Sequence, residues 1–137
     1  MSLRAVIDTN VIVSAALTPD GHPDLVVRLA LASGFQLVAS NQILLEYTEV
    51  LTRPAFRLPL NAVRELISAL RARALVVAPD EIAKGICSDP DDTFVLGTAV
   101  AGKADYIITG NVKHFPSSHK GVAVITPRAF LVRVQQG

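Results

Sequence analysis

Residues 4–10 read Arg-Ala-Val-Ile-Asp-Thr-Asn, and this stretch decides the fold class. A short apolar run with two β-branched residues is typical of a strand buried on both faces, and a carboxylate follows it directly. Similar runs recur along the chain, separated by stretches of helical period. The predicted strands are Arg4 to Ile7, Gln36 to Ala39, Ala74 to Ala78, Tyr106 to Thr109 and Val122 to Ile125. This alternation predicts an α/β fold, a three-layer α/β/α sandwich around a parallel sheet of four to five strands.

Start and stop signals place helices between these strands. The predicted helices run from about Asn10 to Leu17, from Pro23 to Ser33, from a cap at Ser40 to about Leu51, from Pro59 or Leu60 to Arg73, from Asp89-Pro90 to about Ala101, and onward from Pro127. Gly34 and Gly102 follow two of them as stop signals. Because crossovers between parallel strands are right-handed, the carboxyl ends of the strands should meet at one edge, where open α/β sheets bind ligands.

Composition narrows the class of protein. The chain has 137 residues, of which 50% are hydrophobic and 18% charged, so it suits one globular domain spanning residues 1–137. No apolar run approaches the roughly 20 residues of a membrane span, since Arg28 interrupts the longest one. The first strand begins too near the N-terminus to leave room for a signal peptide. Cys87 is the only cysteine, and a cytoplasmic location is therefore expected.

The net charge of +1 says little about partners, but its distribution is uneven. Five arginines and one acid, Glu65, lie between Arg53 and Arg73. This stretch could follow the phosphate backbone of a nucleic acid, with Arg53 and Arg57 as candidate RNA contacts. An ordinary solvated helix face explains it equally well, so both interpretations stay open.

Asp8 and Glu46 are the first two candidate site residues. Asp8 follows the first strand at the ligand-binding edge, although it could equally cap the next helix. In the helix after Ser40, at about 100° per residue, Glu49 falls opposite the apolar stripe, whereas Glu46 falls at its margin. The stripe consists of Ile43, Leu44, Tyr47, Val50 and Leu51. A carboxylate beside a buried stripe needs a partner, so Glu46 is the better candidate ligand.

The third acidic element is Ser88-Asp89-Pro90-Asp91-Asp92. Helix capping and the helix dipole account for Asp89 and Asp91. Asp92 differs, because it lies one turn before Leu96 and in line with the apolar stripe of its helix. It should therefore point inward at the same sheet edge as Asp8.

Three inward carboxylates form a hard-oxygen site that suits Mg²⁺ or Mn²⁺ as cofactor. Such an ion can activate water and neutralise charge on a phosphate. No cysteine or histidine pattern competes for the metal, and His22, His114 and His119 are interpreted as loop residues without a chemical role.

The ordered set of motifs resembles PIN-domain proteins over essentially the whole chain. The set comprises Val-Ile-Asp8-Thr-Asn, Ser40 with Glu46, Asp-Pro-Asp-Asp92 with Ala99, Ala-Asp-Tyr-Ile-Ile-Thr109-Gly, and Ile125-Thr126-Pro127 with Phe130-Leu131. The closest likeness is to toxin components of bacterial toxin–antitoxin pairs, the VapC-like ribonucleases. The resemblance implies Mg²⁺- or Mn²⁺-dependent RNA cleavage, with Asp8, Glu46 and Asp92 holding the metal. It also implies supporting roles for Asn10, Ser40 and Thr109, a small antitoxin partner and a homodimer.

One departure from the family pattern concerns the position after Thr109-Gly110. Many relatives carry an aspartate there, where this chain has Asn111. An amide oxygen can still bind a metal but brings no charge, so the site should hold metal more weakly. Asp89 or Asp91 would be placed to compensate.

Two other functions remain open. A non-catalytic RNA- or protein-binding module with a weakened metal site would also explain Asn111 and the arginine-rich stretch. A different α/β enzyme could use Asp8 as a nucleophile, although Asn10 stands where the common phosphotransferases carry a second aspartate. Neither a glycine-rich dinucleotide fingerprint nor a P-loop is present in the sequence.

Overall fold

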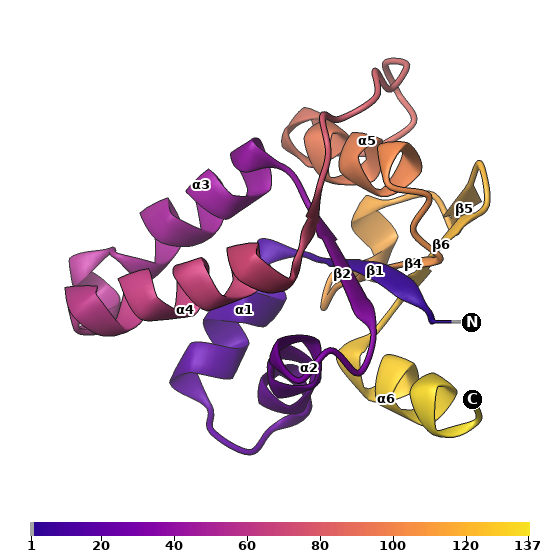
Figure 1. Ribbon diagram of the computed structural model, residues 1–137. Helices are drawn as coiled ribbons and strands as arrows, with labels where there is room; N and C mark the ends of the chain where they lie inside the picture. The colour runs from indigo at the N-terminus through magenta and orange to yellow at the C-terminus, as the bar shows by residue number, and fades with distance from the viewer. Residues whose placement is uncertain (1) are drawn as a thin grey trace.

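The computed structural model describes residues 2–137, and a six-stranded sheet runs through its centre (Figure 1). The order of the strands is β3-β2-β1-β4-β6-β5. They are β1 (Arg4–Ile7), β2 (Gln36–Ala39), β3 (Leu75–Val76), β4 (Tyr106–Ile108), β5 (Ser118–His119) and β6 (Val122–Ile125). Five of them pair in parallel, so the predicted α/β class with a parallel central sheet is confirmed.

The sheet differs from the prediction at its two edges. A sixth strand, β5, pairs antiparallel with β6 through a two-residue turn at Lys120-Gly121, where both residues have positive φ, as a type I′ hairpin requires. Because β5 is short and polar, no apolar pattern reveals it. At the other edge, β3 has two residues, both exposed, and not the predicted run from Ala74 to Ala78. An edge strand with neither side buried lacks the packing that would extend it.

Six α-helices surround the sheet, with α5 on one face and α2 and α6 on the other (Figure 1). They are α1 (Thr9–Leu17), α2 (His22–Leu31), α3 (Asn41–Leu51), α4 (Leu60–Arg73), α5 (Thr93–Ala101) and α6 (Pro127–Gln135). The helices α3 and α4 pack together as a hairpin that extends away from the sheet (Figure 1). No helix within residues 2–137 is long and apolar enough to cross a membrane.

Two helix starts differ from the sequence prediction. His22 is the first residue of α2 and does not lie in a loop, because Gly21 provides the N-cap and Pro23 fits the first turn. The predicted fifth helix begins as a separate 3₁₀ turn, η2 (Pro90–Asp92), before α5 starts at Thr93.

The core lies between the central strands and the helices that cover them. The last three residues of β1 and β2 are buried, as are Ile107 and Ile108 of β4. On the α5 side, the loop after β3 approaches so closely that a Cβ atom at Gly97 would lie 2.2 Å from the carbonyl oxygen of Asp80. The Asp80 N–H donates to the Gly97 carbonyl over 3.0 Å. The fold therefore requires glycine at position 97.

Candidate active site

Buried polar residues follow each of the three central strands. Asp8 comes after β1, Ser40 after β2 and Thr109 after β4, and all three are buried. Parallel pairing brings the carboxyl ends of these strands to one edge of the sheet. The structure thus places Asp8, Ser40 and Thr109 at the sheet edge where the sequence predicted a ligand site.

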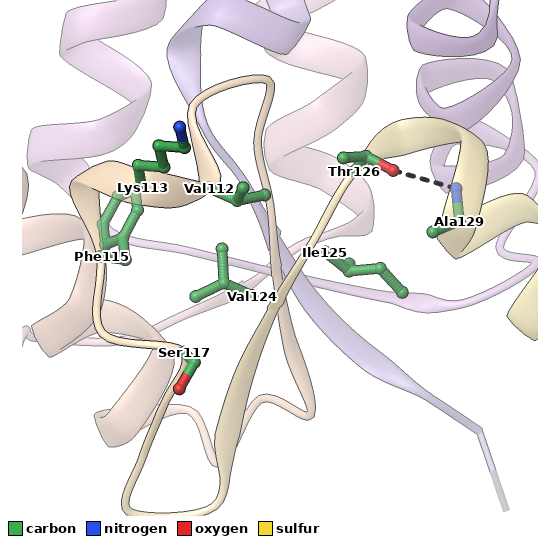
Figure 2. Close-up of a pocket in the computed structure, with 8 residues that line it drawn as sticks. All are labelled: Val112, Lys113, Phe115, Ser117, Val124, Ile125, Thr126 and Ala129. Atoms are coloured by element: carbon green, nitrogen blue, oxygen red, sulfur yellow. Dashed lines mark hydrogen bonds between the residues drawn. The ribbon is translucent and has the colours of Figure 1, made fainter.

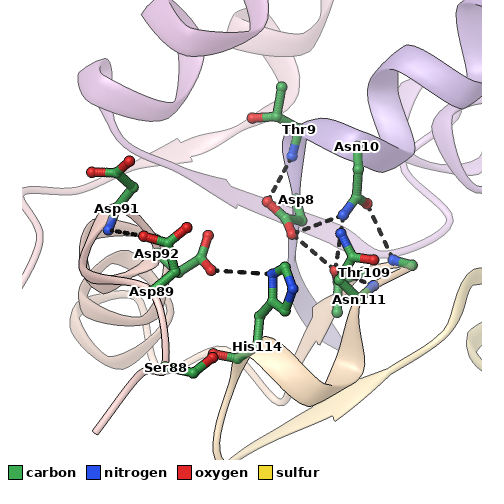
Figure 3. Close-up of polar contacts among 11 residues, drawn as sticks. Asp8, Thr9, Asn10, Ser88, Asp89, Asp91, Asp92, Thr109, Asn111 and His114 are labelled. Atoms are coloured by element: carbon green, nitrogen blue, oxygen red, sulfur yellow. Dashed lines mark hydrogen bonds and ion pairs between the residues drawn. The ribbon is translucent and has the colours of Figure 1, made fainter. Parts of the chain in front are cut away.

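Asp8 is held from several sides (Figure 3). Its Oδ1 accepts a hydrogen bond from the backbone N–H of Thr9 at 2.9 Å, so it does cap α1. Its Oδ2 accepts from the Thr109 hydroxyl at 2.8 Å and from the Asn10 amide at 3.3 Å. Burial raises the pKa of Asp8, and the hydrogen bonds from Thr109 and Thr9 lower it. Capping and a place in the site are compatible, because each uses a different carboxylate oxygen.

The supporting residues Asn10 and Thr109 form one network with this carboxylate. The Asn10 side chain also donates to the Thr109 hydroxyl and accepts from the N–H of Gly110. The N–H of Asn111 donates to the same Thr109 hydroxyl at 3.0 Å. This places the exposed Asn111 next to Asp8, at the rim of the site (Figure 3).

Glu46 faces the same region from α3. The Thr9 hydroxyl donates to its Oε2 at 2.7 Å, which ties α3 to the start of α1. Burial is the main cause that raises the pKa of Glu46; the Thr9 hydrogen bond lowers it, and the charges of Asp8 and Asp91 raise it. Glu46 is half-buried whereas Glu49 is exposed, as the helical angles predicted.

Ser40 acts on the helices and makes no hydrogen bond to the carboxylates. Its hydroxyl accepts from the N–H of Ile43, which caps α3, and from the hydroxyl of Thr98 in α5 at 2.9 Å. Ser40 therefore fixes the helix that carries Glu46 relative to the helix that follows Asp92.

Asp92 stands at the N-cap position of α5 but makes no capping hydrogen bond. Its Oδ2 is the one buried side-chain nitrogen or oxygen in residues 2–137 that lacks a hydrogen-bond partner. Burial raises the pKa of Asp92 to about 6, and the negative charge of Asp8 adds to the rise. The charges of Asp89 and Glu46 act in the same direction, so Asp8, Glu46 and Asp92 share one electrostatic field.

The apolar stripe of α5 is wider than predicted, because every residue from Val95 to Ala99 is buried.

Asp89 and Asp91, the two acids before Asp92, lie at the surface. Asp89 accepts from the N–H of Asp91 at 3.0 Å, which agrees with a capping role. Both reach the other carboxylates through charge, since Asp89 raises the pKa of Asp92 and Asp91 raises that of Glu46.

Sequence reasoning missed two residues of this site, Thr9 and His114. The Nδ1 atom of His114 lies 3.6 Å from Oδ2 of Asp92 (Figure 3). His114 ends a 3₁₀ turn, η3 (Val112–His114), and such a turn has no periodic signal in the sequence. Thr9 could have been found, because a hydroxyl directly after the strand-end carboxylate starts α1 at the same sheet edge.

The two arginines proposed as RNA contacts do not join the carboxylates. Arg53 and Arg57 flank a short 3₁₀ turn, η1 (Pro54–Phe56), at the end of the α3–α4 hairpin remote from the sheet (Figure 1). Both are exposed. Of the other arginines in that stretch, Arg71 donates to the side chain of Asn41 and Arg73 donates to the carbonyl of Leu31.

The chemistry of the donors suits a hard divalent cation, and the unpartnered Asp92 oxygen fits one. A buried charge without a partner is costly, and a cation would remove that cost. In residues 2–137, no group of three or more His, Cys, Asp or Glu side chains is arranged to hold a metal ion. An ion shared by Asp8, Glu46 and Asp92 therefore requires at least one side chain to rotate.

An apolar pocket of about 530 Å³ lies beside this site, between η3, β6 and the start of α6 (Figure 2). Val112, Phe115 and Ile125 line it together with Lys113. The segment from Asn111 to His114 thus borders both the carboxylates and this pocket.

Comparison with known proteins identifies the family. The family model of the PIN domain matches residues 4–113. An uncharacterized protein of Methanocaldococcus jannaschii is 27% identical over 143 residues, which cover 96% of this chain and 91% of that protein. The crystal structure of VapBC2 from Rickettsia felis bound to a DNA fragment from their promoter has a similar fold, with a TM-score of 0.57 and 14% identity. That match covers 90% of this chain and 98% of the other.

The family match spans Asp8, Glu46, Asp92 and Asn111, and it extends over most of the sheet. It confirms the resemblance seen in the sequence motifs. This chain therefore belongs to the PIN-domain family.

Proposed function

We propose that this chain is a ribonuclease that hydrolyses RNA phosphodiester bonds with Mg²⁺ or Mn²⁺ held by Asp8, Glu46 and Asp92. The observation that carries the proposal is the buried, unpartnered Oδ2 of Asp92 beside the charge of Asp8. Membership of the PIN-domain family supports it. When bound, the cation supplies Lewis-acid chemistry, which neutralises charge that develops on the phosphate.

The residues of this chain would orient the carboxylates for that task. The Thr109 hydroxyl and the Asn10 amide fix Asp8, and the Thr9 hydroxyl fixes Glu46. Hydrogen bonds of this kind set the direction of a ligand's free oxygen and lower the cost of arranging the site. Asn111 would offer its amide oxygen at the rim as a further, neutral ligand.

The proposal is tested by RNA cleavage with Glu46→Gln and Glu49→Gln. Both glutamates lie on α3, but only Glu46 is half-buried and bonded to Thr9. We expect Glu46→Gln to lower kcat at least about 100-fold in Mg²⁺ or Mn²⁺, and Glu49→Gln to change it little. Equal cleavage by the wild type and Glu46→Gln, or by Asp8→Asn, would show that the assignment is wrong.

We also propose that Arg53 and Arg57 contact the RNA backbone at the end of the α3–α4 hairpin. Their exposure and positive charge support this. Replacing both by alanine should raise KM and leave kcat unchanged, and the slope of log affinity against log salt should fall by about one for each phosphate that the variant no longer neutralises. Unchanged affinity and salt slope would rule out an RNA-binding role for these arginines.

We further propose that the chain is a cytoplasmic toxin that is inhibited by a small antitoxin and forms a homodimer. The motif resemblance and the fold shared with the VapBC2 protein of Rickettsia felis support this proposal. Growth arrest on expression of the wild type, absent for Glu46→Gln and relieved by a neighbouring small gene, would support it. Normal growth with active wild-type enzyme in the cell would contradict it, and sedimentation tests the dimer.

A second candidate function is a non-catalytic RNA-binding module. It is favoured by the neutral Asn111 and by the lack, within the described residues, of three side chains already arranged around a metal. Absence of Mn²⁺ binding at millimolar metal, together with retained RNA binding, would establish this alternative.

A further inference from the structure

The position of His114 is fixed by the backbone. Its N–H donates to the carbonyl of Asn111 at 3.0 Å and closes the η3 turn. Its carbonyl accepts two hydrogen bonds from Ser88, one from the backbone N–H at 3.3 Å and one from the hydroxyl at 3.2 Å. Ser88 immediately precedes the segment Asp89–Asp92. These bonds therefore hold the turn that carries His114 against the segment that carries Asp92.

The imidazole faces the carboxylates without bonding to them. Its ring lies between the carboxylate of Asp92 and the network around Asp8 (Figure 3). The separation of 3.6 Å between Nδ1 and Oδ2 of Asp92 is longer than a hydrogen bond, and that oxygen has no other partner.

We propose that Nδ1 of His114 is a further ligand of the divalent cation, an inference that rests on the proposed function. Two adjacent ligands that each lie about 2.1 Å from one octahedral ion are about 3.0 Å apart. The observed separation is 3.6 Å, so a movement of roughly 0.6 Å would bring Nδ1 and Oδ2 of Asp92 to the spacing of adjacent ligands. The side chain of His114 is 49% exposed, so its ring has room to adjust.

A nitrogen ligand has a consequence for metal preference. Mg²⁺ binds oxygen ligands, whereas imidazole favours transition metals. A site with three carboxylates and an imidazole should therefore select Mn²⁺ over Mg²⁺ more strongly than one with oxygen ligands alone. The imidazole would also supply the ligand that the neutral, exposed Asn111 provides only weakly.

The proposal is tested with the full chain and Mn²⁺, without RNA. Pulsed electron paramagnetic resonance detects the ¹⁴N nucleus of an imidazole bound to Mn²⁺, and calorimetry gives the affinities for Mn²⁺ and Mg²⁺. We expect the nitrogen signal in the wild type and its loss in His114→Asn. The ratio of Mn²⁺ to Mg²⁺ affinity should fall about tenfold in this variant.

The chain offers a matched control in its other two histidines, which lie in α2 and β5. The double variant His22→Asn with His119→Asn should keep the nitrogen signal. His114→Asp restores an oxygen ligand, so it should bind Mn²⁺ without the signal. Circular dichroism checks that each variant is folded.

The possible failures are distinguishable. If the wild type binds Mn²⁺ without a nitrogen signal, or if His114→Asn keeps both signal and affinity ratio, the inference about His114 is overturned and the three-carboxylate site stands. An ion pair between a protonated His114 and Asp92 would give that result. If the wild type binds no Mn²⁺ at millimolar concentration, the proposed function falls as well.

Discussion

At the scale of single residues, Asp92 has the most costly environment in the site. Its carboxylate is largely buried, it shares the field of other acids, and its position at the start of α5 yields no capping bond. Natural proteins keep buried polar groups paired, and an exception marks a place where something else binds. The raised pKa of this carboxylate has the same cause, and it makes the stability of the protein depend on pH.

This cost predicts how stability changes with pH in the absence of metal. The pKa of Asp92 is about 6 in the folded protein, against an ordinary value of 3.8 for an exposed aspartate, so the folded protein binds this proton more tightly than the unfolded chain. The stabilisation is complete below about pH 4 and is lost as the pH rises through about 6. We therefore expect the difference in unfolding free energy between Asp92→Asn and the wild type to change in favour of the variant by about 2 kcal/mol as the pH rises from 4 to 7.5.

Urea unfolding in the presence of a chelator measures this difference. Asp91→Asn is the matched control, because Asp91 is adjacent and exposed. Adding Mn²⁺ at pH 7.5 should stabilise the wild type and the control more than it stabilises Asp92→Asn. A difference between Asp92→Asn and the wild type that does not vary with pH would refute the assigned environment of Asp92.

Residue by residue, periodicity located two of the three acids well. The angle on α3 correctly separated half-buried Glu46 from exposed Glu49. Asp92 lies one turn before the buried Leu96, and this spacing predicted that the Asp92 side chain points inward. The helix α5 is in fact buried on more sides than this single stripe suggests. His114 could not be found in this way, because its place depends on η3 and on long-range bonds to Ser88.

At the scale of elements, the close approach of a loop to α5 determines how rigidly the acidic segment is held. The loop between β3 and η2 contacts α5 at Gly97, where backbone meets backbone. The same helix is joined to α3 by the hydrogen bond between Thr98 and Ser40. The relative placement of Glu46 and Asp92 therefore depends on how α5 packs.

The tight contact at Gly97 predicts a strong effect of one added methyl group. In Gly97→Ala the new Cβ would lie 2.2 Å from the carbonyl oxygen of Asp80, so backbone must move. We expect a loss of about 2 kcal/mol in unfolding free energy, measured by urea denaturation. Gly110→Ala is the control, because its nearest neighbour would be 3.7 Å away. Equal stability of Gly97→Ala and the wild type would mean that this loop does not lie against α5.

The bounds of elements with a buried apolar face were predictable, and the bounds of those without one were not. The strands β1, β2 and β6 have the predicted bounds, and β4 is one residue shorter, since their pattern reflects burial in the sheet. At the edges of the sheet, β5 has no apolar signature, and β3 was predicted from Ala74 to Ala78 but forms only over Leu75–Val76. The helix α2 starts at His22, one residue before the predicted start at Pro23, because Gly21 is its N-cap.

At the scale of the whole molecule, the strand order creates the site. Because β1 lies between β2 and β4, the residues after these strands are neighbours although they are far apart in sequence. Asp8 and Thr109 are 101 positions apart and share a hydrogen bond. The sequence predicted that strand ends would share one edge, but not which strands would be neighbours, because that order is set by tertiary packing. The meeting of Asp8 with Thr109 required the structure.

If the free carboxylate oxygen of Asp92 serves a divalent cation, its removal must weaken metal binding, which calorimetric titration with Mn²⁺ measures. The wild type and Asp91→Asn should bind Mn²⁺ with similar affinity, and Asp92→Asn should bind at least about tenfold more weakly. Binding of Mn²⁺ by Asp92→Asn as tightly as by the wild type would show that this oxygen does not hold the cation.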